Sequence, residues 1–175
     1  MKFDRNTLKT VFGYYLTLLE KVLGKSFKKE NLQSIFNYLP INAHLSTSGQ
    51  PTAIQFKTIA NNGFKFIINL APHSSENSLK NETDIVKSLG MQYTHIPVDF
   101  DHPQQQDFEQ FVNAIEACGS KKIWVHCAAN MRVSCFIFLY KTTILGHSQE
   151  QAQIDLHKIW HPFGVWQDFI SKKIN

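Results

Sequence analysis

From about residue 35 onward, apolar runs of strand length alternate with amphipathic segments of helix length, and Gly, Pro or Asn separates neighbouring segments. The strand-length runs are residues 42–47, 64–70, 92–98 and 121–126, and the helix-length segments are 52–61, 82–89 and 107–118. Ile123, Trp124 and Val125 are all apolar, which is typical of a strand buried on both faces of a parallel sheet. The alternation therefore predicts an α/β fold in which helices flank a central, mostly parallel sheet of four to five strands.

Residues 6–23 have a different pattern, in which apolar side chains recur at helical spacing and Gly24 follows as a stop signal. The apolar positions are Leu8, Val11, Phe12, Tyr15, Leu16, Leu19 and Val22. Polar residues from 25 to 33 separate this segment from the rest. We expect an amphipathic helix in an N-terminal extension, residues 1–30, beside one main domain, residues 31–175. The helix is expected to pack on that domain, with a partner contact as the alternative.

Composition and charge indicate the cellular compartment and the classes of binding partner that we expect. The formal net charge is +4, a mild excess that suits anionic small molecules or phosphorylated partners, and no basic stripe with interleaved aromatics indicates nucleic-acid binding. Three cysteines form no disulfide framework and match no zinc spacing, so we expect a reducing compartment and no metal site. The first 25 residues contain neither a signal peptide nor a membrane span, so a cytoplasmic protein without a membrane partner is expected. No pattern predicts the oligomeric state.

The stretch from Trp124 to Ser134 carries the chemistry, because it joins the central strand to a helix predicted to begin near Arg132. Ligands bind beyond the carboxyl ends of strands in open α/β sheets, and a helix N-terminus there presents free amide hydrogens and a positive dipole end to an anion. The same field stabilises a thiolate at Cys127. Arg132, one of only two arginines, can hold two oxygens of a phosphate or sulfate. These two residues are the candidate nucleophile and oxyanion holder.

Neighbouring residues have supporting roles in this hypothesis. The amide groups of the intervening loop, Ala128, Ala129, Asn130 and Met131, are expected to surround the bound anion. Asn130 suits a left-handed backbone position, since Asn tolerates that region better than any residue but Gly. Ser134 could donate a hydrogen bond to the sulfur, and His126 could orient the loop backbone.

These residues resemble the signature of the protein tyrosine phosphatase superfamily, in which His-Cys precedes a short loop, Arg and Ser. Three further segments, residues 46–51, 63–70 and 93–98, look like successive core segments of a small bacterial dual-specificity-like family whose relatives occur fused to β-lactamase-fold hydrolases. The resemblance covers roughly residues 38 to 145. It implies a cysteine-phosphatase-like fold and a catalytic domain that needs no cofactor. It also implies hydrolysis of a phosphate monoester, on a protein or a small molecule, through a cysteinyl-phosphate intermediate.

The loop departs from the usual pattern of that superfamily. Most members have five residues between Cys and Arg and a Gly within the loop, whereas here four residues separate Cys127 from Arg132, no Gly is present, and Val133 precedes Ser134. A loop shortened in this way resembles that of rhodanese sulfurtransferases. A sulfurtransferase, or a phosphate-binding module without turnover, therefore stays as an alternative function.

A phosphatase of this kind needs a general acid for the leaving oxygen, normally an Asp on a loop beyond a neighbouring strand. Residues 98–103 form such a loop, and Asp101 is preferred to Asp99 because it is closer to the apex. The alternative for either carboxylate is a helix cap or a solvated loop residue. Asp107 is set aside, because it falls in the first turn of the next helix and complements the helix dipole.

Overall fold

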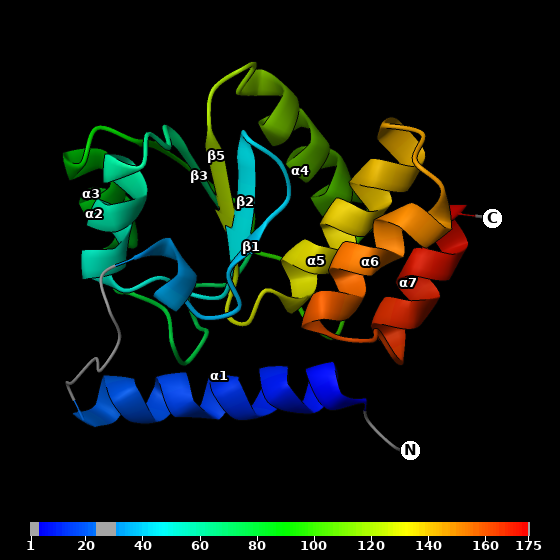
Figure 1. The fold of residues 1–175 in the computed structure, drawn as a ribbon, viewed down its shortest axis with the longest axis horizontal. Helices are drawn as coiled ribbons and strands as arrows, with labels where there is room; N and C mark the ends of the chain where they lie inside the picture. Colours follow the sequence, from blue (N-terminus) through cyan, green and yellow to red (C-terminus); the bar gives the residue numbers. More distant parts are fainter. Residues whose placement is uncertain (1–3, 24–30, 175) are drawn as a thin grey trace.

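The computed structural model describes residues 4–23 and 31–174, which form an α/β fold around a five-stranded sheet in the order β1-β2-β5-β3-β4 (Figure 1). The strands are β1 (Leu39–Pro40), β2 (Leu45–Ser48), β3 (Phe66–Asn69), β4 (Gln92–His95) and β5 (Ile123–His126). Only the short edge strand β1 pairs antiparallel, and every other pair is parallel. The predicted mostly parallel sheet is therefore confirmed, with β5 at its centre.

Helices cover both faces of this sheet (Figure 1). On one face lie α2 (Ala53–Asn61) and α3 (Glu82–Ser88), and on the other lie α4 (Gln105–Ala117), α5 (Met131–Leu139), α6 (Gln149–Ile159) and α7 (Val165–Ile174). Two shorter turns are the 3₁₀ helix η1 (Leu32–Ser34) and the π-helical segment η2 (Tyr140–Ile144), which continues α5. The helix predicted to follow the Cys127 loop is α5.

The central strand β5 contributes to a hydrophobic core on each side of the sheet. Ile123 and Val125 pack with the α4 to α7 helices, whereas Trp124 packs with Phe56 and Ile59 of α2. Successive side chains of a strand point to opposite faces, so an uninterrupted apolar run is what a doubly covered strand requires. The sequence prediction of a strand buried on both faces is confirmed.

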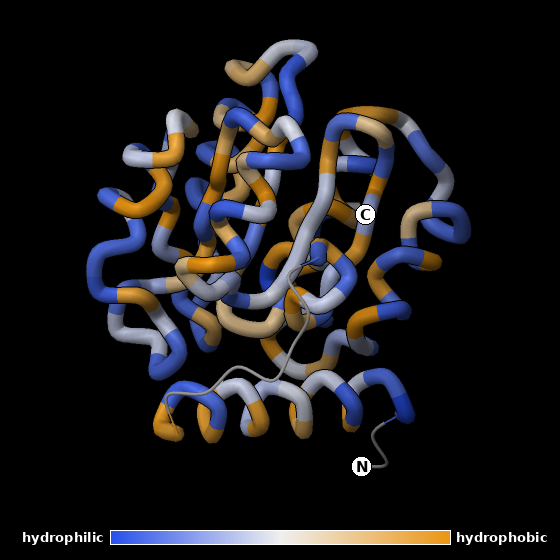
Figure 2. The backbone as a smooth tube through the Cα atoms, turned by 60° about the vertical axis from the view of Figure 1, so that its left-hand side comes forward, coloured by the Kyte–Doolittle hydropathy of each residue, from blue (hydrophilic) through white to orange (hydrophobic). Residues whose placement is uncertain are grey.

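The amphipathic N-terminal helix is present as α1 (Arg5–Leu23), and it packs against α6 across the lower end of the domain in Figure 1. Its polar side faces the domain. The seven apolar residues that define its periodicity are all substantially exposed, while Thr7 and Thr10 are buried. Figure 2 shows the hydrophobic positions of α1 along the side that faces away from the domain. Of the polar segment expected at residues 25–33, residues 25–30 lie outside the described residues.

Candidate active site

Cys127 and Arg132 line one cavity of about 280 Å³. Cys127 follows the last residue of β5 and Arg132 is the second residue of α5, so the short loop between strand and helix places both at the same edge of the sheet. Cys127 is fully buried and Arg132 is 9% exposed. The first two residues of α5, Met131 and Arg132, line this cavity, and a helix N-terminus favours a bound anion.

Three hydrogen bonds tie the carbonyl groups of the loop to the surrounding protein. The Ala128 carbonyl accepts from the Gln50 backbone N–H at 3.2 Å and from Asn77 Nδ2 at 2.9 Å, and the Ala129 carbonyl accepts from Asn37 Nδ2 at 2.9 Å. None of these three donors lines the cavity. The carbonyl groups of Ala128 and Ala129 are therefore satisfied by partners outside it.

Asn130 has a left-handed backbone conformation, with φ of 66° and ψ of 4°, and it caps the start of α5. Its side chain is buried and donates through Nδ2 to the Asn37 carbonyl at 2.8 Å and to Thr47 Oγ1 at 3.0 Å. The expected left-handed position is thus observed. Because the side chain is also fixed, Asn130 anchors the loop to both the β2 strand and the residues before β1.

Beneath the loop, the buried carboxylate of Glu82 connects residues on or next to four strands. It lies 3.1 Å from His126 Nε2, accepts from Asn69 Nδ2 and from the Tyr93 hydroxyl at 2.9 Å each, and accepts from Gln50 Nε2. A buried charge is stable only when it is paired and hydrogen-bonded in this way. His126 lies against this group immediately before Cys127, which is the orienting position suggested for it.

The pKa of Glu82 reflects these contacts. Burial raises it, but the charge of His126 and the hydrogen bonds from Gln50 and Tyr93 outweigh burial and lower the pKa to about 2. Burial and the neighbouring carboxylate raise the pKa of Tyr93. Glu82 is therefore an anion beside the His126 ring, and no sequence motif marked it because α3 and β5 are far apart in the chain.

The Arg132 guanidinium packs on an aromatic ring and retains an unused donor. Its Cζ lies 5.2 Å from the centroid of the Phe100 ring. Arg132 Nε is buried and has no hydrogen-bond partner among the described residues. Because buried donors are almost always paired, this N–H is available to hydrogen-bond an anion.

The Ser134 hydroxyl donates to the Met131 carbonyl within α5 at 2.9 Å. The expected donation from Ser134 to the cysteine sulfur would require the hydroxyl to rotate away from that bond. Cys135, one residue further along, is fully buried, and burial raises the pKa of its thiol far above the usual value. Of the two cysteines in this region, only Cys127 borders the cavity.

Both candidate general acids lie on the predicted loop but outside the cavity wall. Asp99 and Asp101 are exposed, and Phe100 between them is the residue that lines the cavity. Asp99 Oδ1 accepts from the Asp101 backbone N–H at 2.8 Å, and this bond lowers the pKa of Asp99. Asp107 accepts from the Gln104 backbone N–H at the start of α4, as expected for a helix-terminal residue.

The opposite wall of the cavity comes from α1. Val11, Tyr14 and Tyr15 face the Cys127 loop across the cavity, and the Tyr14 hydroxyl lies 3.5 Å from Glu76 Oε2. No sequence pattern signals this contribution, because helical periodicity shows which residues share a face but not what that face covers. The residues predicted as an N-terminal extension therefore share the site with the main domain.

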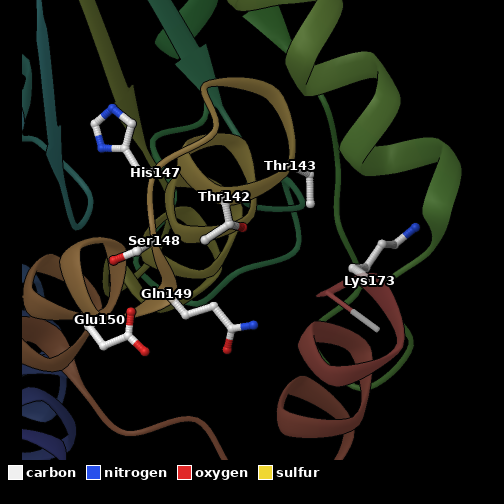
Figure 3. A pocket seen from close by; sticks show the side chains of 7 residues that line it. All are labelled: Thr142, Thr143, His147, Ser148, Gln149, Glu150 and Lys173. Atoms are coloured by element: carbon white, nitrogen blue, oxygen red, sulfur yellow. The ribbon is translucent and has the colours of Figure 1, made fainter.

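A larger hollow of about 520 Å³ lies elsewhere on the protein (Figure 3). Its side chains come from η2, the turn before α6, α6 itself and α7, and they are Thr142, Thr143, His147, Ser148, Gln149, Glu150 and Lys173. It shares no residue with the Cys127 cavity and contains no cysteine, so its size does not make it the catalytic site. Over residues 4–23 and 31–174, no His, Cys, Asp and Glu side chains group as a metal site, and no helix is long and apolar enough to cross a bilayer.

A parallel sheet whose central strand leads through a Cys-to-Arg loop into a helix is the architecture of the protein tyrosine phosphatase superfamily. The family model described as DSP-PTPase phosphatase fused to NAD+ Kinase matches residues 31–162, and the chain belongs to this family. The family and fold expected from the sequence are thus confirmed.

Similar proteins agree with this assignment. A DUF442 protein from Shewanella putrefaciens CN-32 is 32% identical, with a TM-score of 0.73 over 82% of this chain and 94% of that protein. TpbA of P. aeruginosa, crystallised in complex with pTyr, has the same fold at 13% identity, with a TM-score of 0.59 over 70% of this chain and 72% of that one. A "Beta-lactamase hydrolase-like protein" of Xylella fastidiosa is 33% identical over 95 residues, 53% of this chain. That match spans only 22% of the Xylella protein.

Proposed function

We propose that the protein is a cysteine-dependent phosphatase that hydrolyses phosphate monoesters through a cysteinyl-phosphate intermediate. The observation that carries this proposal is the position of Cys127 and Arg132 on one cavity, with the loop carbonyls hydrogen-bonded away from it. A sulfur nucleophile, a guanidinium with a free N–H, and a helix N-terminus then converge on one phosphoryl group.

In the first step, the Cys127 thiolate attacks phosphorus, an S–P bond forms, and the ester P–O bond breaks. The leaving oxygen takes a proton from the general acid, which we assign to Asp101 on the loop next to Phe100. In the second step, water attacks the cysteinyl phosphate and gives a proton to the Asp101 carboxylate, the S–P bond breaks, and inorganic phosphate and the thiolate are released. Arg132 and the loop amides of Ala128 to Met131 hold the phosphoryl oxygens in both steps.

The walls of the cavity support a substrate with an aromatic or apolar carrier group. Val11, Tyr15 and Phe100 surround the space between the Cys127 loop and α1. Such walls suit the ring of a phosphotyrosine better than a small hydrophilic phosphoester. A phosphorylated protein or a small aryl phosphate is therefore the substrate class that we assign.

The test is steady-state hydrolysis of 4-nitrophenyl phosphate by the wild type, Cys127→Ser and Arg132→Ala, with Cys118→Ser as the matched control. Cys118 is also buried, but it lies at the end of α4 outside the cavity. We expect Cys127→Ser to lose turnover, Arg132→Ala to lose about 10²- to 10³-fold, and Cys118→Ser to retain it. Equal rates in all four proteins would refute the proposal.

The exposed positions of Asp99 and Asp101 favour one alternative, a phosphate-binding module without turnover. Isothermal titration with phosphate and vanadate separates the two functions. Binding that Arg132→Ala abolishes, together with no hydrolysis by the wild type, would select the binding module. Transfer of sulfur from thiosulfate to cyanide, with a persulfide on Cys127, would instead select a sulfurtransferase.

A further inference from the structure

Helix α1 is attached to the domain by its polar side. Thr10 Oγ1 donates to the Ile159 carbonyl at 2.6 Å, and Asn6 Nδ2 donates to the His157 carbonyl at 2.9 Å. Near the other end of the helix, Lys21 Nζ donates to the Glu76 carbonyl at 2.7 Å. These bonds lie at both ends and fix which side of α1 faces the protein.

A glycine lets the middle of α1 approach the domain closely. A Cβ atom at Gly13 would lie 2.5 Å from Cε2 of the Phe36 ring, so a side chain there would require the ring or the helix to shift. Gly13 lies on the same helix face as Thr10 and Thr17, and the Thr17 hydroxyl bonds to the helix itself. Small and polar residues therefore occupy the inward side at these three positions.

The outward side of α1 is an exposed apolar stripe, formed by Leu8, Phe12, Leu16, Leu19, Val22 and Leu23, while the partly exposed Val11 and Tyr15 border it and line the Cys127 cavity. Its members reach 66% exposure at Phe12 and 83% at Val22. A surface helix normally turns its apolar face to the core, so α1 reverses the usual arrangement. In Figure 2 hydrophobic positions recur along the side of α1 that faces away from the domain. Large exposed apolar patches of this kind mark contact surfaces.

Positive charge is concentrated in the same part of the chain. Residues 1–30 contain seven Lys or Arg and three Asp or Glu, whereas residues 31–175 contain eleven of each, so the whole net charge of +4 belongs to the N-terminal segment. On the helix itself, Arg5 and Lys9 are exposed beside the first apolar residues of the stripe. The outward surface of α1 thus combines apolar side chains with cations.

We propose that this surface docks the protein on an anionic lipid bilayer, with the apolar stripe at the boundary between headgroups and acyl chains. An apolar helix face with adjoining Lys and Arg is the chemistry of an interfacial helix, and anionic lipid complements the charge of the segment. A second copy of the chain would bring two positively charged segments together, which disfavours a self-dimer. The helix lies in the plane of the membrane surface, consistent with its failure to qualify as a span.

No membrane partner was expected from the sequence, because the first 25 residues contain neither a signal peptide nor a membrane span. An interfacial helix needs no span, and with Gly13 and Thr10 facing the domain the apolar stripe stays largely uncovered among the described residues. The docking proposal is independent of the phosphatase proposal, because it does not involve Cys127 or Arg132.

The test is flotation of the full chain with vesicles of phosphatidylglycerol and phosphatidylcholine, and with phosphatidylcholine alone. We expect the wild type to float with the anionic vesicles and to dissociate as salt is raised. The stripe variant Phe12→Ser/Leu16→Ser/Leu19→Ser should bind about tenfold or more weakly. The matched control Ile54→Ser/Ile144→Ser/Ile154→Ser removes three exposed apolar side chains outside α1 and should bind like the wild type.

A charge variant provides a second route that leaves the stripe intact. Arg5→Glu/Lys9→Glu should abolish the preference for anionic vesicles. Wild-type protein that does not float with anionic vesicles, or a stripe variant that floats as well as the wild type, would overturn the proposal. The proposal would also be overturned if light scattering without vesicles showed that the wild type is a dimer and the stripe variant a monomer. A second copy of the chain would then cover this face.

Discussion

The Arg132 guanidinium carbon lies 5.2 Å from the centroid of the Phe100 ring, so the residue proposed to hold the phosphoryl group packs on the loop proposed to supply its proton. The contact joins the start of α5 to the segment between β4 and α4. Arg132 is therefore positioned from two sides, by its own helix and by an aromatic platform.

Replacement of this platform tests its contribution. We expect Phe100→Ala to lower kcat/KM for 4-nitrophenyl phosphate by about two- to thirtyfold, because a contact of this kind is worth about 0.5 to 2 kcal/mol. Phe66→Ala is the control, since Lys121 lies over the Phe66 ring at 5.6 Å in a similar pair away from the cavity. A similar loss in both variants would show a general stability effect and contradict this role for Phe100.

Two asparagine substitutions separate the candidate acids. The lowered pKa of Asp99 disfavours the protonated form that an acid needs, so we expect Asp101→Asn to reduce kcat on phenyl phosphate by about 10²- to 10⁴-fold, with a smaller effect of Asp99→Asn. The loss should shrink on 4-nitrophenyl phosphate, whose leaving group needs less protonation. Equal losses on both substrates would argue against acid catalysis by Asp101.

Glu82 should make stability depend on acid. Its pKa falls from 4.5 to about 2 in the folded protein, so its contribution is fully present above pH 4.5 and is lost as pH falls toward 2. We expect Glu82→Gln to lower the free energy of unfolding near pH 7 by about 3 to 5 kcal/mol and to flatten its decline between pH 5 and 2. Urea unfolding at a series of pH values measures both effects.

The control for Glu82 is Asp84→Asn, which removes an exposed carboxylate from the same helix. Its unfolding curve should keep the acid dependence of the wild type. A Glu82→Gln protein that still loses stability as steeply as the wild type below pH 4.5 would assign that loss to other carboxylates.

Asn130 is expected to tolerate glycine better than alanine. Both changes remove the side-chain hydrogen bonds to Asn37 and Thr47. Alanine also has a Cβ atom, which is strained in the left-handed backbone conformation at this position, whereas glycine has none. Asn130→Ala should therefore be less stable than Asn130→Gly by about 1 to 2 kcal/mol in chemical denaturation. Equal stabilities would show that the loop relaxes out of the left-handed conformation.

Local chemistry explains what the sequence predicted well. An uninterrupted apolar run identified the central strand at Ile123 to Val125, and Asn130 was recognised because few residues accept positive φ. The loop from Cys127 to Arg132 is contiguous, so its role could be inferred before its shape was known. Strand order depends on long-range pairing, so the strands were predicted from local patterns but their order was not.

Contacts between distant segments explain what was missed. The Glu82 to His126 pair joins α3 to β5, and neither residue carries a mark that points to the other. The orientation of α1 depended on Gly13 meeting Phe36, whereas hydrophobic periodicity alone favoured the opposite face. Phe100 stands between two carboxylates, and nothing in its local sequence marks it as the residue that contacts the guanidinium.

The central position of β5 has a consequence for folding kinetics. Its neighbours β2 and β3 come from much earlier in the chain, and Ser48 and Asn69 both pair with His126. Non-local parallel pairing is a slow step in chain folding. Cys127 therefore reaches its final position only after β5 has paired with β2 and β3. A refolding chain should regain turnover at the rate at which the sheet is completed, and no folding intermediate that precedes this step should be active.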